Sequence, residues 1–259
     1  MNLIDTHAHL TFEELAGQLD AVLERSRQAG TTRWITVGTN VLDNEKVLRL
    51  VSEHDDLFGA LGYHPHDADD IMDADMVLLK KQLHHARIVA IGECGLDYHY
   101  MYSSANNQRR IFRAHLDIAA DLQKPVVIHT REAFDETMDI LDDYAGRLRN
   151  VVIHCFGGDA AQTARVLDAG YYISFTGTVT FTRSEALREV AKTIPLDRLM
   201  IETDCPYISP HPKRNTKPNE PALLVYTAQC LADLHGLPLE TFAEKVTKTS
   251  ETFFGLEHL

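Results

Sequence analysis

The sequence is short of positive charge, and this shortage limits the partners that it can bind. Its 259 residues include 25 lysines and arginines against 38 aspartates and glutamates, a formal net charge of −13. This balance argues against a broad basic surface for nucleic acid. It does not exclude a nucleic acid held at a metal centre, because divalent cations supply local positive charge that the formal count omits.

Long apolar runs are also missing. None approaches the roughly 20 residues that a membrane-spanning helix needs. The first residues show no basic region followed by an apolar one, as a signal peptide would. We therefore expect a cytoplasmic protein, and a monomer by default.

Cysteines are few, and their spacing fits no recognised disulfide or metal-binding motif. The four of them, Cys94, Cys155, Cys205 and Cys230, contain no C-x-x-C pair. Three directly follow an acidic or histidine residue at a predicted strand end, and neighbours in a strand face opposite sides. We expect small buried side chains, with a redox or metal role as the alternative.

No Gly-x-Gly-x-x-Gly or Walker-type loop follows a strand, which removes the usual signature of nucleotide-binding folds. Short apolar, β-branched runs instead alternate with longer amphipathic stretches. The predicted strands cover residues 3–6, 34–37, 57–61, 88–92, 125–128, 151–153, 171–174 and 198–201. The predicted helices cover residues 13–28, 44–54, 75–85, 107–122, 133–144, 160–169, 184–193, 221–235 and 238–253.

Near-continuous apolar strands separated by helices are typical of a parallel sheet covered on both faces. Eight such units favour a barrel over a doubly wound sheet, and no linker divides the chain. The predicted fold class is α/β: a single (β/α)8 TIM-like barrel domain over residues 1–259. Its active site is expected at the C-terminal ends of the strands.

The first strand ends in Asp5-Thr6-His7-Ala8-His9. Residues two apart share a face of a strand, so both imidazoles can reach one ion. Asp5 lies on the same face one layer deeper, where a carboxylate could orient a ligand histidine. By itself, a His-x-His pair is equally open to a structural interpretation.

Four further strands end in a histidine or a carboxylate: Glu93, His129, His154 and Asp204. In a parallel barrel these ends meet, so coincidence does not explain the pattern. Imidazole and carboxylate ligands suit Zn, Mn, Fe, Co or Ni, and carboxylates with waters also admit Mg. Six ligands are too many for one tetrahedral ion, and they predict two divalent ions about 3.5–4 Å apart.

Other residues near these strand ends are candidates for contact with the substrate. His64 could touch the substrate or stabilise charge, whereas His66 is expected to be peripheral. Glu202, on the face of Asp204, is a candidate orienter of a ligand or an internal structural charge. Tyr63 and Tyr98 could stack bases or simply pack. The candidate phosphate contacts are Arg131, Arg183, Lys213, Arg214 and Lys217, with a solvated surface charge as the simpler interpretation of each.

These motifs, in this order, resemble the TatD family of metal-dependent DNases within the amidohydrolase-like barrels. The resemblance runs from residue 4 to about residue 254. The matching strings are DTHAHL, GYHPH, IGECGLDY, QKPVVIHTREA, NVVIHCFGG, GYYISFTGTVTF, PLDRLMIETDCPY and NEP. Two positions depart from the family pattern: Thr11 replaces an aspartate, and the basic loop before NEP has altered spacing.

The resemblance implies a two-metal centre with Glu93 as the bridging ligand. One ion would be held by Glu93 together with His7, His9 and Asp204. The other would be held by Glu93, His129 and His154. The presence of glutamate at this position favours the DNase branch, because other amidohydrolase-like barrels often have a modified lysine there.

The activity implied is hydrolysis of phosphodiesters in DNA and sometimes RNA, endonucleolytic or 3′-to-5′ exonucleolytic. Mg is the commonly used metal, with Mn, Zn or another transition metal as alternatives. Two other classes stay open. One is hydrolysis of a small amide, lactone or phosphoester on the same barrel. The other is a binding or scaffold protein with an inactive metal site.

Overall fold

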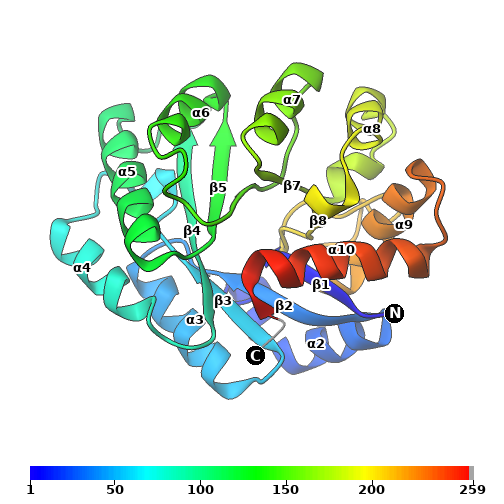
Figure 1. The fold of residues 1–259 in the computed structure, drawn as a ribbon. Helices are drawn as coiled ribbons and strands as arrows, with labels where there is room; N and C mark the ends of the chain where they lie inside the picture. Colours follow the sequence, from blue (N-terminus) through cyan, green and yellow to red (C-terminus); the bar gives the residue numbers. More distant parts are fainter. Residues whose placement is uncertain (257–259) are drawn as a thin grey trace. The chain divides into compact units, whose positions relative to one another are not determined.

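The computed structural model describes residues 1–256, which contain eight strands that alternate with helices along the chain (Figure 1). All eight strands belong to one sheet, in the order β1-β2-β3-β4-β5-β6-β7-β8. The neighbouring strands β1 and β2, β3 and β4, β4 and β5, β5 and β6, and β7 and β8 pair in parallel. This is the (β/α)8 arrangement predicted from the sequence. The chain divides into two compact units: residues 1–36 with the part from Cys155 onward (unit 1), and Val37–His154 (unit 2).

Unit 1 joins the two ends of the chain. It contains β1 (Leu3–Ala8), α1 (Glu13–Ala16), α2 (Leu19–Gln28), nearly all of β2 (Thr31–Val37), α7 (Ala160–Asp168), β7 (Tyr172–Phe175), α8 (Glu185–Ala191), β8 (Leu199–Ile201), α9 (Leu224–Leu234) and α10 (Leu239–Phe254). Short 3-10 turns lie at Gly177–Thr180, Leu196–Arg198 and Pro221–Leu223.

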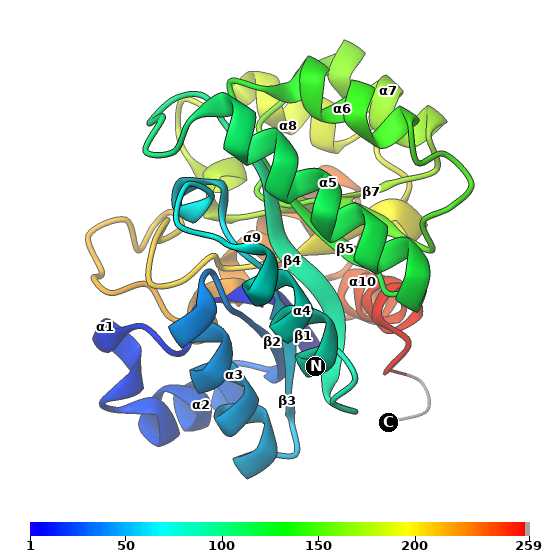
Figure 2. The same ribbon diagram turned by 90° about the vertical axis from the view of Figure 1, so that its left-hand side faces the viewer.

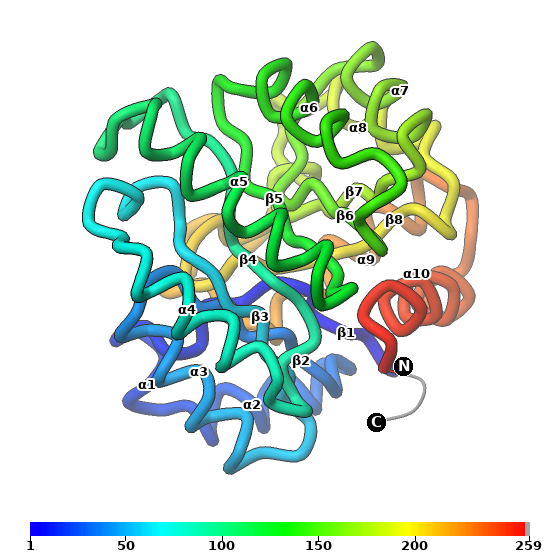
Figure 3. Tube along the Cα trace, turned by 60° about the vertical axis from the view of Figure 1, so that its left-hand side comes forward, coloured from blue at the N-terminus to red at the C-terminus, as the bar shows by residue number. Residues whose placement is uncertain are grey.

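Within unit 1, the segment after β8 bonds to the end of β1. The amide of Asp204 donates to the carbonyl of His7 at 2.9 Å, and the amide of His9 donates to the carbonyl of Cys205 at 2.8 Å. Helix α10 lies beside the N-terminus, where the Thr247 hydroxyl donates to the Asn2 carbonyl at 2.6 Å (Figure 3). The first and last strands of the chain therefore present their C-terminal ends together.

Unit 2 contains the middle of the sheet. Its elements are α3 (Val41–Glu53), β3 (Leu57–Leu61), a 3-10 turn (Pro65–Asp67), α4 (Asp73–Gln82), β4 (Ile88–Asp97), α5 (Ala105–Leu122), β5 (Val126–Arg131), α6 (Phe134–Asp142) and β6 (Val151–Ile153). Helix α5 runs alongside β4 and β5 (Figure 2). All ten residues of β4 are buried.

Several predicted boundaries differ from the observed ones, among them those of the first predicted helix and the fourth predicted strand. The predicted helix 13–28 is two helices, because Gln18 leaves the helical conformation at φ −139° and ψ 28°. The predicted strand 88–92 continues to Asp97, so Glu93 lies inside β4 rather than past its end. Gly95 permits this continuation: its φ is +144°, and a Cβ there would collide with the carbonyl of His129 on the neighbouring strand.

Among the helices of residues 1–256, none is both long and apolar enough to cross a membrane.

A buried histidine joins α5 to the end of β3. His115 Nδ1 donates to the Ile111 carbonyl at 2.7 Å, and its Nε2 accepts from the Tyr63 amide at 3.0 Å. The bond that Nε2 accepts requires the neutral ring, with its proton on Nδ1. Burial lowers the pKa of His115 to about 4.

This histidine predicts a pH-dependent stability. In the unfolded chain His115 binds a proton below its ordinary pKa of 6.5, whereas the folded ring stays neutral down to about pH 4. Its contribution is therefore full above pH 6.5 and is lost as the pH falls to 4, by up to about 3 kcal/mol. Between pH 4 and 6.5, the free energy of unfolding of the chelated wild-type protein, measured with urea, should depend more steeply on pH than that of the His115→Gln protein. Equal slopes would contradict the assignment.

Candidate metal sites

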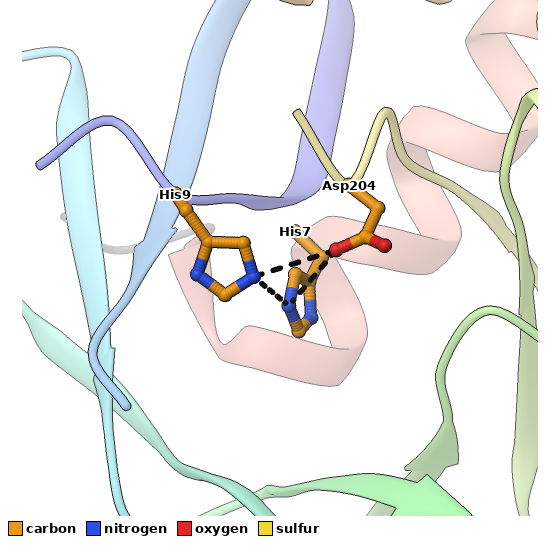
Figure 4. Close-up of side chains that lie close together, drawn as sticks. All are labelled: His7, His9 and Asp204. Carbon is orange, nitrogen blue, oxygen red and sulfur yellow. Dashed lines mark hydrogen bonds and ion pairs between the residues drawn. The ribbon is translucent and has the colours of Figure 1, made fainter. Parts of the chain in front are cut away.

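Three donor atoms of unit 1 lie close together at the junction of β1 and β8 (Figure 4). The Nε2 atoms of His7 and His9 are 3.3 Å apart. Asp204 Oδ1 lies 3.7 Å from His7 Nε2 and 3.4 Å from His9 Nε2. Both histidines are buried. We call this group the His7 cluster.

The spacing of the His7 cluster suits a bound divalent cation. Donors that bind one ion tetrahedrally at about 2.0–2.2 Å lie about 3.3–3.6 Å from one another. The separations of 3.3 and 3.4 Å fall within that range, and the third, 3.7 Å, lies just above it. The structure thus brings together three residues that the sequence predicted as ligands; their role as ligands stays a prediction.

Asp5 anchors the segment that carries Asp204. Its carboxylate accepts from the Thr203 amide at 2.9 Å and from the Thr203 hydroxyl at 2.6 Å. The His7 amide lies at 3.4 Å from the same carboxylate. Burial raises the pKa of Asp5 to about 7, although the bonds from Thr203 oppose the rise. These bonds act on Thr203 and on the main chain of His7, rather than on the ligand imidazole that the sequence suggested.

The NEP string supports the same segment, a role that the sequence reasoning missed. Asn219 is buried, and its Nδ2 donates to the carbonyls of Thr203 at 3.0 Å and Tyr207 at 2.5 Å. Glu220 accepts two bonds from Arg25 Nε and one at 2.6 Å from Arg25 Nη2. The Asn219-Glu220-Pro221 string, already noted in the sequence, was the signal that could have revealed this role.

Glu202 is buried, and its Oε1 accepts from the Cys155 amide at 2.6 Å. It therefore fixes main chain in unit 1; its predicted role as an orienter stays a prediction. All four cysteines are free thiols. Cys94 and Cys205 are buried as predicted, whereas Cys155 and Cys230 are half-buried.

Glu93 is the centre of a second group, which lies in unit 2. Its Oε1 is 2.8 Å from His154 Nε2, 2.9 Å from His129 Nδ1 and 3.6 Å from His64 Nε2. His154 Nε2 and His129 Nδ1 are 3.4 Å apart. We call these four residues the Glu93 cluster. Donors around one ion with bonds of about 2.0–2.2 Å are separated by about 2.8–3.6 Å, in octahedral or tetrahedral geometry, so this cluster also fits a divalent ion.

Asp97 holds the Glu93 cluster from behind, and the sequence reasoning missed it. Its Oδ2 accepts from His129 Nε2 at 3.1 Å and from His66 Nε2 at 3.0 Å. The bond fixes the ring of His129 so that Nδ1 faces Glu93. The signal was available, because Glu93 and Asp97 are four residues apart and share a strand face. His66, expected to be peripheral, is joined to the cluster through this carboxylate.

The hydrogen bond between Asp97 and His129 favours the charged form of both side chains. Burial raises the pKa of Asp97, but bonds from His129, the Tyr100 amide and His66 outweigh it and hold that pKa well below its usual range. Burial lowers the pKa of His129, and its bonds to Asp97 and Glu93 outweigh that effect and raise it. A histidine placed between two carboxylates is suited to binding a cation once its proton leaves.

Replacing Asp97 by asparagine is expected to weaken metal binding about 10- to 100-fold, because the amide lacks the charge that orients His129 and raises its basicity. Competition between the protein and a chromophoric chelator for Mn²⁺ or Zn²⁺ measures this. Asp73→Asn, on the exposed surface of α4, is the matched control. An affinity of Asp97→Asn equal to that of the control would remove Asp97 from the site.

The basic residues predicted to contact the substrate are not members of either cluster. Arg131 ends β5, with its Cζ 4.7 Å from the centroid of the Tyr100 ring. Arg183 is exposed in unit 1, and Arg214 and Lys217 lie in its exposed segment 211–217. Arg214 Cζ lies 3.6 Å from the centroid of the Phe181 ring.

The structure corrects one proposed base-stacking residue. Tyr63 is 1% exposed, and its hydroxyl donates to the Asp75 carbonyl at 2.8 Å, so its ring is not available to a ligand. Tyr98 is half-buried and donates to Glu136 Oε2 at 2.7 Å. The exposed tyrosines of the described residues lie instead at positions 100, 102 and 207.

Comparison with known proteins gives a consistent result over nearly the whole chain. The family model described as TatD related DNase matches residues 4–255. An uncharacterized metal-dependent hydrolase, YabD of Bacillus subtilis (strain 168), is 36% identical over 252 residues, 97% of this chain and 98% of that protein. A protein named 3′-5′ ssDNA/RNA exonuclease TatD, from Pantoea ananatis (strain LMG 20103), is 35% identical over 260 residues, 98% of this chain and 100% of its own.

A solved structure agrees with these relatives. The crystal structure of YJJV, a TatD homolog from Escherichia coli K12, superposes with a TM-score of 0.92 at 30% sequence identity. The superposition covers 98% of each chain. This chain therefore belongs to the TatD-related DNase family and is a metal-dependent hydrolase.

Proposed function

We propose that this protein is a nuclease that hydrolyses phosphodiester bonds of single-stranded DNA or RNA from the 3′ end. The observation that carries the proposal is the pair of histidine and carboxylate clusters, each with donor separations suited to a divalent ion. The substrate class and direction come from the similarity to a relative named as a 3′-5′ ssDNA/RNA exonuclease.

Two divalent ions, Mg²⁺ or Mn²⁺ for activity, are proposed as cofactors. His7, His9 and Asp204 would hold one, and Glu93, His129 and His154 the other. The bridging role of Glu93 stays a prediction from the family resemblance. Such ions supply Lewis acidity and an activated water for in-line attack on phosphorus.

Side chains of this protein orient the proposed metal ligands and limit the access of water to them. Asp97 fixes the ring of His129, and Asp5 fixes the segment of Asp204 through Thr203. His64 is half-buried beside Glu93, and its proposed role is to contact a phosphate oxygen of the substrate. Burial of Glu93 keeps water from screening its charge.

Cleavage of end-labelled single- and double-stranded DNA and RNA tests the proposal. The protein is first treated with a chelator, and Mg²⁺, Mn²⁺ or Zn²⁺ is then added back. We expect stepwise shortening of single strands from the 3′ end in the presence of a restoring metal. Absence of metal-restored cleavage, or equal cleavage by the His129→Ala/His154→Ala protein, would reject the nuclease assignment.

A hydrolase of small amides, lactones or phosphoesters is the alternative, since the net charge of −13 offers little general attraction for nucleic acid. The exposed basic residues Lys213, Arg214 and Lys217 separate the two. Changing them to glutamate should weaken oligonucleotide cleavage and lower the salt dependence of binding by about one unit of slope per lost phosphate contact. Hydrolysis of a small neutral ester should be spared. Unchanged oligonucleotide kinetics would favour the small-substrate alternative.

A further inference from the structure

The loop that follows β4 in unit 2 displays large apolar side chains to solvent. Tyr100, Met101 and Tyr102 are 46%, 47% and 67% exposed. Met101 adopts a left-handed φ of 51°, which turns the chain between the two tyrosines. Their rings are stacked, with centroids 5.2 Å apart and planes 10° from parallel. The two stacked rings thus form one partly exposed aromatic unit, which we call the tyrosine pair.

Hydrogen bonds hold this loop at both ends. Asp97 Oδ1 accepts from the amides of His99 and Tyr100, each at 3.0 Å. At the other end the Ser103 hydroxyl donates to the His66 carbonyl at 2.6 Å and accepts from the Asp69 amide at 3.0 Å. The tyrosine pair is therefore presented in a fixed position, so that binding a flat ligand costs little ordering entropy.

The tyrosine pair adjoins the Glu93 cluster through a series of rings. His66 meets Tyr102 edge-on at 4.8 Å and Tyr100 edge-on at 5.4 Å between centroids. The ring centroid of His66 also lies 4.2 Å from that of His64, and the ring centroid of His64 lies 4.5 Å from that of His129. A ligand on the tyrosine pair is thus a short distance from residues proposed to bind metal and phosphate.

A cation completes the surface. The Arg131 guanidinium lies 4.7 Å from the centroid of the Tyr100 ring, and Arg131 is two residues from His129 on β5. A guanidinium beside an aromatic face suits a ligand that carries both a flat ring and a negative charge. A nucleotide has these two features.

We propose that the tyrosine pair is a stacking subsite for an unpaired nucleobase of a single-stranded substrate, with Arg131 beside it for the backbone phosphate. The proposal rests on the nuclease function proposed above. In a duplex the bases already stack on one another, so this subsite selects single strands. It is tolerant of sequence, because every base presents a π face. With a net charge of −13, stacking supplies affinity that general electrostatic attraction does not.

The test compares two single-stranded DNA oligonucleotides with phosphorothioate linkages near the 3′ end, which resist cleavage. One carries ordinary bases there, and the other carries abasic tetrahydrofuran units. Fluorescence anisotropy with the metal-loaded protein gives both Kd values. We expect wild type to bind the base-bearing strand about 5- to 150-fold more tightly, the range for one stacked base.

Variants separate the aromatic rings from other effects. Tyr100→Ala/Tyr102→Ala should lose the preference for bases, whereas Tyr100→Phe/Tyr102→Phe should keep it. Val77→Ala, another exposed apolar residue of unit 2, should behave as wild type. An equal Kd of wild type for both strands would overturn the subsite. A preserved preference in the alanine variant would also overturn it.

A competing use of this surface, contact with a second copy of the chain, has its own signature. In that case the alanine variant would change its sedimentation coefficient at unchanged oligonucleotide Kd, and the subsite would be rejected. The two proposals also fail separately. Metal-restored cleavage without base preference rejects only the subsite, whereas binding with base preference but no cleavage by wild type rejects only the nuclease assignment.

Discussion

Replacing Glu93 by glutamine is expected to lower metal-restored hydrolysis by about three orders of magnitude. Glu93 Oε1 lies within 2.9 Å of donor nitrogens on both His129 and His154. Glutamine keeps the shape of the side chain but removes the negative charge at the point where the ligands converge. Losing several kcal/mol of metal-dependent stabilisation corresponds to a rate loss of this size. Initial rates on a 5′-labelled single strand measure it.

Glu45→Gln, on the exposed face of α3, is the matched control and should retain full activity. The amount of bound metal adds a second measurement. If Glu93 serves both ions, as the family resemblance implies, Glu93→Gln should lose both. Loss of one ion would restrict Glu93 to the Glu93 cluster. A Glu93→Gln protein with more than a tenth of wild-type activity would contradict the proposed role.

Replacing Asp5 by alanine should lower the free energy of unfolding by about 3 kcal/mol. The change leaves the buried amide and hydroxyl of Thr203 without the acceptors at 2.9 and 2.6 Å that Asp5 supplies. Urea unfolding of the chelated protein at pH 7 measures the loss.

The conservative variant Asp5→Asn should stay within about 1 kcal/mol of wild type. Its amide keeps one oxygen for the Thr203 amide, and the raised pKa of Asp5 means that the wild-type carboxyl is itself partly uncharged near neutrality. If alanine and asparagine proved equally stable, the bonds to Thr203 would not be what Asp5 contributes.

The architecture was predictable because its signal repeats along the chain. Strands buried on both faces read as continuous apolar runs, and helices read as amphipathic stretches, so all eight strands were located. The same logic placed His7, His9, Glu93, His129, His154 and Asp204 at strand ends, and the structure gathers them into two clusters.

The remaining features depend on contacts that a linear pattern does not contain. The predicted fourth strand ended at residue 92, yet β4 continues because its ladder with β5 pairs Gly95 with His129 and Asp97 with Arg131. The same pairing brings Asp97 to His129. The stacking of Tyr100 and Tyr102 depends on the backbone conformation of Met101, and no residue type signals that conformation.

Asp97 divides its two oxygens between different tasks. Oδ2 accepts from His129 and His66, while Oδ1 accepts from the amides at the start of the loop that carries the tyrosine pair. An ion bound by His129 and a base bound by the loop would therefore draw on the same carboxylate. By reciprocity, whatever amount metal binding adds to the affinity for a single strand, the strand adds to the affinity for metal. The enzyme would then hold its metal most tightly when its substrate is present.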